Sequence, residues 1–102
     1  MVGLPIACNP SALTSESFAA HQAEGRRLQA LALERRELPD GWALRMPDDD
    51  ETALACARWI IRERRCCPFF VFALVWGSES DAVWLRITGP EGTKEILRAE
   101  LR

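Results

Sequence analysis

The chain has 102 residues, of which 48% are hydrophobic and 27% charged, and its formal net charge at pH 7 is −2. This length and composition predict one globular domain over residues 1–102, with a buried core, and exclude a disordered chain. The small net charge gives no indication of binding to nucleic acid or to a membrane surface, and no apolar run reaches the roughly 20 residues that span a bilayer. Residues 1–8 lack the features of a signal peptide, so we expect a cytoplasmic protein.

The N-terminal part predicts an irregular arm followed by a helix. Residues 1–13 contain the turn-forming sequence Asn9-Pro10-Ser11 and are expected to form the arm. Thr14 suits the N-cap of a first helix that ends near Leu28. Spacing by three and four residues predicts the side chains on its inward face, which are Phe18, His21, Gly25 and Leu28.

Two strands joined by a turn are expected after this helix. Residues 30–38 show a hydrophobic period near two, which is typical of a strand. The sequence Pro39-Asp40-Gly41 then predicts the turn into a second strand. That second strand alternates its apolar side chains onto one face, and they are Trp42, Leu44 and Met46.

A second helix is expected between residues 48 and 68. The three aspartates at 48–50 suit a helix N-terminus, and Pro68 disfavours helical geometry at the residue before it. Glu63 and the arginines of this segment are expected to face solvent. The apolar side is expected to pack into the core, and it comprises Ala53, Leu54, Cys56, Ala57, Ile60 and Ile61.

Two more strands and a last helix complete the expected fold. Residues 69–76 form an apolar run of strand length, residues 77–81 a hairpin loop, and residues 82–88 the returning strand. Gly89-Pro90 is expected to begin the last helix, with Pro90 at its first position. The order α-β-β-α-β-β-α predicts an α+β fold, in which a largely antiparallel four-stranded sheet carries its helices on one face.

The four cysteines, at positions 8, 56, 66 and 67, are expected to be thiols in a reducing compartment. A disulfide between the adjacent Cys66 and Cys67 is strained, and a chain with this apolar content does not need disulfides to fold. These two residues leave the end of the second helix together, where the backbone becomes irregular and their sulfurs are able to converge. Thiolates select soft ions, here zinc, copper(I), mercury or arsenite, over magnesium and calcium.

Three other side chains bear on this candidate metal site. Cys8 lies in the arm, which is free to cross the sheet, and is the predicted third ligand. Cys56 precedes Cys66 by ten residues, about 15 Å along a helix, whereas two zinc-bound sulfurs are at most roughly 4.6 Å apart, so Cys56 is expected in the core. His21, the only histidine, is expected to be a hydrogen-bonded core residue. It completes a zinc site with three cysteines only if the first helix crosses this end of the sheet.

Two opposing influences act on the thiols at the end of the second helix. The negative end of a helix dipole raises a thiol pKa, whereas nearby positive charges favour the thiolate. The sequence supplies such charges at Arg62, Arg64 and Arg65, and it leaves the sign of the net effect open.

The order of these motifs resembles that in a group of small bacterial proteins of unassigned function. The shared layout is an early cysteine, a Thr-capped helix, Leu-Pro-Asp-Gly in a hairpin, Arg-Cys-Cys-Pro-Phe, and Thr-Gly-Pro-Glu-Gly before a last helix. It spans nearly the whole chain. The resemblance implies one coherent domain and brings no known activity with it. The matching positions are Cys8, Cys66, Cys67, Pro68 and Phe69.

Two functions of different class fit this sequence. One is binding of a soft metal or metalloid ion through Cys66, Cys67 and Cys8. The other is a non-catalytic homodimeric interaction domain with buried cysteines. Its sheet leaves an edge or an aromatic surface that a second copy would cover. Trp76 and Trp84 contribute to that aromatic surface if they share a face. The sequence does not indicate an enzyme, because it has no second histidine for a base-and-orienter pair.

Overall fold

The structure is a computed structural model that describes residues 15–77 and 82–100. Within these ranges the elements follow the order α-β-β-α-β-β-α, and four antiparallel strands form one sheet with the spatial order β1-β2-β4-β3. The predicted α+β fold is therefore confirmed. The predicted arm over residues 1–13 and the N-cap Thr14 lie outside the described residues. No helix in the described ranges is both long enough and apolar enough to cross a membrane.

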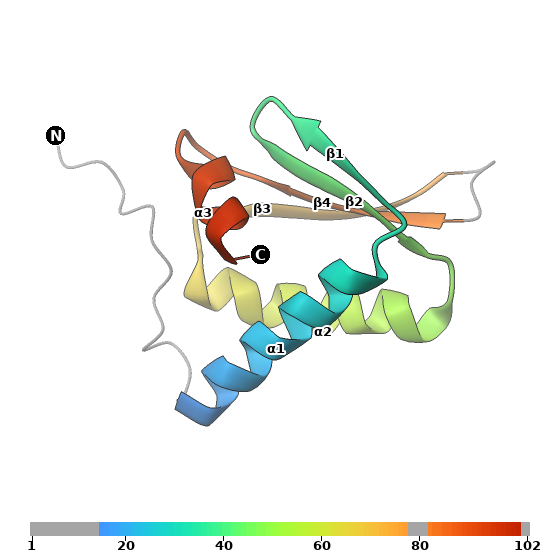
Figure 1. The fold of residues 1–102 in the computed structure, drawn as a ribbon, viewed down its shortest axis with the longest axis horizontal. Coiled ribbons are helices and arrows are strands. Elements are labelled where there is room, and N and C mark those ends of the chain that lie inside the picture. The colour runs from blue at the N-terminus through green and yellow to red at the C-terminus, as the bar shows by residue number, and fades with distance from the viewer. Residues whose placement is uncertain (1–14, 78–81, 101–102) are drawn as a thin grey trace, which may run out of the picture.

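Figure 1 shows how the elements are arranged along the chain. Their bounds are α1 (Ser15–Leu31), β1 (Glu34–Leu38), β2 (Gly41–Pro47), α2 (Asp50–Cys66), β3 (Val71–Trp76), β4 (Ala82–Thr88) and α3 (Thr93–Glu100). The last helix begins three residues after the predicted Pro90. Gly92 adopts a positive φ of 97°, which is incompatible with a helix, and the Pro90 carbonyl accepts a turn hydrogen bond from the Thr93 N–H.

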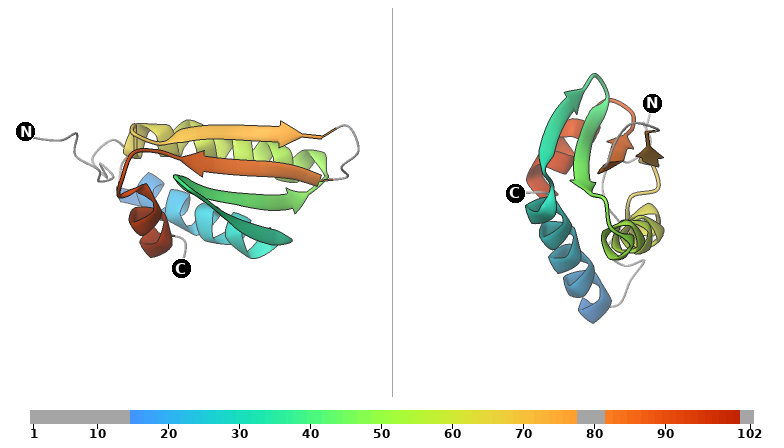
Figure 2. Two further views of the ribbon diagram at one scale, coloured as in Figure 1. Left: turned by 90° about the horizontal axis from the view of Figure 1, so that it is seen from above. Right: turned by 90° about the vertical axis from the view of Figure 1, so that its right-hand side faces the viewer.

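All three helices cover the same face of the sheet (Figure 2). The register sets Leu44 opposite Leu85 and Met46 opposite Val83, so the inward side chains of β2 and β4 form one layer under the helices. These residues are at most 3% exposed. Trp84 lies opposite Val75, whereas Trp76 lies opposite Val83. The two tryptophans therefore occupy opposite faces, and the prediction that they share an uncovered patch is wrong.

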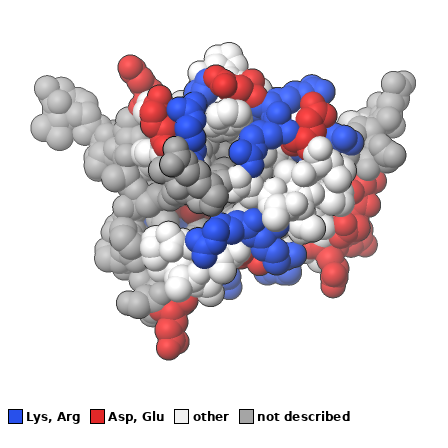
Figure 3. All heavy atoms as spheres, viewed as in Figure 1, with Lys and Arg blue, Asp and Glu red and all other residues white. Residues whose placement is uncertain are grey.

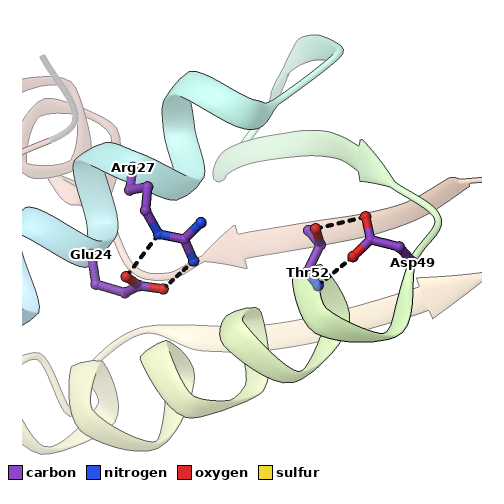
Figure 4. A network of polar contacts seen from close by, with 4 residues as sticks. All are labelled: Glu24, Arg27, Asp49 and Thr52. Atoms are coloured by element: carbon purple, nitrogen blue, oxygen red, sulfur yellow. Dashed lines mark hydrogen bonds and ion pairs between the residues drawn. The ribbon is translucent and has the colours of Figure 1, made fainter.

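The N-terminus of α2 is fixed by a single side chain. The carboxylate of Asp49 accepts hydrogen bonds from the Thr52 backbone N–H at 2.7 Å and from the Thr52 hydroxyl at 2.8 Å (Figure 4). Asp49 itself has extended backbone angles, as an N-cap residue does. Two more carboxylates follow in the first turn, where the helix dipole favours negative charge.

The face of α2 that packs into the core differs from the predicted one. Leu54 and Ile61 were expected to be buried and are 57% and 48% exposed, whereas Glu63 was expected in solvent and is 3% exposed. Trp59 accounts for the difference, because its ring packs against α1 at Gly25, where an added Cβ would approach Nε1 to 2.9 Å. The buried side of α2 consists of Thr52, Ala55, Cys56, Trp59, Glu63 and Cys66.

Candidate functional site

The predicted ligands Cys66 and Cys67 lie where α2 ends and the chain turns toward β3. Cys66 is the last helical residue, and Cys67 caps the helix with φ −128° and ψ 73° while its N–H donates to the Glu63 carbonyl at 2.7 Å. Pro68 follows and prevents the helix from continuing. The two cysteines are 1% and 0% exposed, so both sulfurs lie in the core and not on the surface.

The oxidation states of the described cysteines differ. Cys67 is disulfide-bonded, whereas Cys56 and Cys66 carry thiols. The expectation that every cysteine is a thiol is therefore wrong for Cys67. Cys8, the third predicted ligand, lies outside the described residues.

A buried pair of ionisable side chains lies one helical turn before the cysteines. His21 of α1 and Glu63 of α2 are joined by a hydrogen bond of 2.6 Å between Nε2 and Oε1, and their side chains are 3% and 4% exposed. The His21 ring stacks on Trp59 with a centroid distance of 5.8 Å. The prediction of a hydrogen-bonded core histidine is confirmed, and α1 does cross α2 near its C-terminal end.

This pair is only partly satisfied. His21 Nδ1 and Glu63 Oε2 are buried and have no hydrogen-bond partner among the described residues. In a neutral imidazole, the contact with the carboxylate places the proton on Nε2 and leaves a lone pair on Nδ1. An unpartnered buried polar atom is unfavourable by about 1–3 kcal/mol, so this corner of the core has unused capacity to donate or accept hydrogen bonds.

Glu63 is the residue of this region that the sequence reasoning missed. It precedes Cys66 by three residues and Cys67 by four, which places all three toward the same side of the chain end. The signal was the spacing Cys56, Trp59, Glu63, Cys66, which follows the helical period as regularly as the apolar stripe that was preferred. The charge of Glu63 predicts exposure to solvent, and the sequence shows no partner that would reverse this prediction.

Within residues 15–77 and 82–100, no three His, Cys, Asp or Glu side chains gather closely enough to hold a metal ion. A complete site of three or more ligands therefore requires a residue beyond these ranges. Cys56 is fully buried, and burial, followed by the carboxylate of Glu24, raises the pKa of its thiol to about 11.

Charges surround this end of the molecule without forming a field of one sign. Arg64 and Arg65 lie in the last turn of α2 and are exposed, so water screens their charges from the buried sulfurs. On the face shown in Figure 3, basic and acidic side chains are interspersed.

No protein-family model matches this chain, and no curated protein or solved structure matches it either. Its function is therefore argued from the geometry of the site.

Proposed function

We propose that the reduced protein binds one soft, thiophilic ion per chain through the sulfurs of Cys67 and Cys8, with Cys66 as a third ligand. The observation that carries this proposal is the disulfide at Cys67, because it requires two sulfurs of the chain to converge at the end of α2. Cys56 and Cys66 carry thiols, and we propose Cys8, which lies outside the described residues, as the second sulfur.

A dithiol in this position has the chemistry of a soft-ion site. Reduction of the disulfide by a cellular dithiol adds two electrons and two protons and leaves two thiols at the former bond. Binding of an ion then displaces both protons, and the sulfurs move apart to at most roughly 4.6 Å to hold the ion between them.

Burial favours complexes without net charge, because a charge in the core lacks the solvation that water provides. Two thiolates neutralise mercury(II), and three thiolates neutralise the arsenic(III) centre that forms when arsenite loses its oxygens as water. Three thiolates on zinc(II) leave one negative charge and no fourth ligand, which a closed structural zinc site normally has. The site therefore suits mercury(II) and arsenite better than zinc.

The same disulfide favours a second candidate, which is thiol–disulfide exchange. Cytoplasmic disulfides are usually transient and catalytic or redox-sensing, so the cytoplasmic location that we propose requires this bond to be reducible. The measured reduction potential separates the two roles of the disulfide. A potential below about −300 mV is typical of a structural bond, and a less negative potential is typical of one that cycles.

The test is a titration of the reduced protein against a competing small dithiol, followed by thiolate-to-metal absorption. The ions are mercury(II), arsenite, copper(I) and zinc, and the variants are Cys8→Ser, Cys66→Ser and Cys67→Ser, with Cys56→Ala as the matched buried control. We expect Cys8→Ser and Cys67→Ser to lose tight mercury binding, Cys66→Ser to lose mainly arsenite, and Cys56→Ala to bind as the wild type does. Wild type that binds no better than the competing dithiol would exclude the proposal.

Peptide mapping of the oxidised protein tests the geometry separately from the affinity. We expect one cross-linked peptide pair that contains Cys8 and Cys67. A bond from Cys67 to any other cysteine would exclude Cys8 as the second ligand, whatever the protein binds.

A further inference from the structure

The helix α2 carries an apolar stripe that nothing in the described chain covers. Leu54 and Ile61 are 57% and 48% exposed, and Ala53, Ala57 and Ile60 between them are half-buried. This is the stripe that the sequence assigns to the core. Because α2 turns its Trp59 side inward instead, an apolar surface of helical length remains in contact with water.

The strand β3 presents a second apolar surface. Within residues 15–77 and 82–100 it is at the edge of the sheet and pairs only with β4, and its six residues include no charged residue, no proline and no glycine. Val71, Val75 and Trp76 are 63%, 41% and 56% exposed. Natural edge strands are usually protected by charges, prolines or bulges, so an unprotected apolar edge is typical of a strand that pairs with another chain.

The two surfaces meet at Trp76, whereas Val71 and Val75, which pair with Thr88 and Trp84, lie on the other face of the same edge strand. Figure 2 shows α2 lying along β3, and a shallow hollow between them is lined by Asp50, Ala53, Leu54, Ala57, Leu74 and Trp76. Of the seven large apolar side chains that are exposed in the described ranges, five lie along this edge of the molecule, on one face of β3 or the other. We call it the β3–α2 edge and define it by Leu54, Ile61, Val71, Val75 and Trp76.

We propose that this edge binds a second copy of the chain about a twofold axis, which joins the two sheets into one of eight strands and packs the α2 helices antiparallel. The proposal does not depend on the thiol site. A twofold interface must be complementary to itself, and this edge meets that condition in both of its elements.

In the strand, an antiparallel register centred on Ala73 places Val71 opposite the partner's Val75, a favourable cross-strand pair of β-branched residues. In the helix, an antiparallel arrangement centred between residues 57 and 58 places Leu54 opposite the partner's Ile61. It also places the acidic first turn, Asp50 and Glu51, beside the basic last turn of the partner's α2. Charge and apolar surface therefore match a second copy.

The test is the oligomeric state of the full chain at micromolar concentration, measured by sedimentation equilibrium. We expect wild type to be a dimer and Leu54→Glu and Ile61→Arg each to weaken dimerisation by about tenfold or more, because each buries an unpaired charge. The double variant places these opposite charges against each other and is expected to recover part of the affinity. Leu33→Glu is the matched control: Leu33 is 55% exposed and precedes β1 at the other edge of the sheet.

Both helix positions are exposed in the single chain, so these substitutions are expected to leave its circular dichroism unchanged. A wild type that is monomeric would overturn the proposal, and so would single variants that dimerise as wild type does. A double variant that dimerises no more tightly than either single variant would contradict the antiparallel packing of α2. Val75→Lys repeats the test on the strand and should likewise weaken dimerisation.

Discussion

The His21–Glu63 contact couples the two long helices through one buried hydrogen bond of 2.6 Å. Each side chain is nearly inaccessible to water, and each retains one unpartnered polar atom. The free-energy cost of burying these groups is repaid only while both partners are present. We therefore expect the contact to specify how α1 packs against α2 more than to add net stability.

A double-mutant cycle tests this interpretation. We expect Glu63→Ala to destabilise the protein by about 1–3 kcal/mol, because it leaves the imidazole buried without its hydrogen-bond partner. His21→Leu in combination with Glu63→Met should be less destabilising than the sum of the single changes, since neither side chain then needs a hydrogen bond. Urea unfolding measures all four free energies. Additive single and double effects would show that the two side chains do not interact.

At the scale of the elements, the order of helices and strands was predictable, and the orientation of α2 was not. The turn sequence Pro39-Asp40-Gly41 and the stop at Pro68 act locally, so the sequence locates the hairpin and the end of α2 within a few residues. Which side of α2 faces inward depends on Trp59 finding space at Gly25, which is a contact between residues far apart in the sequence. No local pattern contains that information.

The candidate site divides in the same way. The sequence correctly placed Cys66 and Cys67 at the helix end, and it correctly assigned His21 to a hydrogen-bonded place in the core. It missed Glu63, because burial of a carboxylate is decided by the partner that α1 supplies. It also missed the disulfide at Cys67, because the proximity of two sulfurs depends on the tertiary fold.

The cap of α2 gives a pH-dependent prediction at this scale. The Thr52 N–H and hydroxyl hold the pKa of Asp49 below its ordinary value, because both donate to the ionised carboxylate. Such a group stabilises the fold above its unfolded pKa, and this contribution is lost as the pH falls through the lower folded pKa. We therefore expect Asp49→Ala to lower the melting temperature at neutral pH and to matter progressively less in acid.

Melting curves of wild type and Asp49→Ala between neutral and acidic pH measure this effect. Asp48→Ala removes a neighbouring carboxylate that does not cap the helix and serves as the control. Asp49→Asn keeps a side-chain acceptor without the charge, so its difference from Asp49→Ala should not depend on pH. A constant difference between wild type and Asp49→Ala across the whole range would contradict the role of the ionised carboxylate.

At the scale of the whole molecule, the two proposals occupy different parts of the fold. The thiol site lies at the C-terminal end of α2, inside the layer between helices and sheet. The β3–α2 edge lies along the outer side of the same helix and strand. Dimerisation through this edge is therefore not expected to move the buried sulfurs. Substitutions in the edge should leave ion binding measurable, and substitutions of the cysteines should leave dimerisation measurable.

The redox state of Cys67 should control the stability of the whole chain. A disulfide between Cys8 and Cys67 closes a loop of nearly 60 residues, for which the chain-entropy treatment gives about 4 kcal/mol of stabilisation. We expect the oxidised protein to melt at a higher temperature than the reduced one at the same protein concentration. Mercury(II) that binds the folded chain in preference to the unfolded one should stabilise the reduced protein by up to about 2.7 kcal/mol at a hundredfold excess over its dissociation constant.

Calorimetry of the oxidised, reduced and reduced mercury-bound forms measures these three states, with Cys67→Ser and Cys56→Ala beside wild type. Cys67→Ser lacks both cross-links, so its melting temperature should respond neither to reductant nor to mercury(II). Cys56→Ala should begin from a stability lower by about 1 kcal/mol or more, owing to lost packing, and should then respond as wild type does.

If mercury(II) stabilised Cys67→Ser as much as wild type, the ion would be binding elsewhere. If reduction left the wild-type melting temperature unchanged, the cross-link would not constrain the unfolded chain. Only a sulfur pair that both tethers the chain and holds the ion makes reductant and mercury(II) act in opposite directions through the same residue.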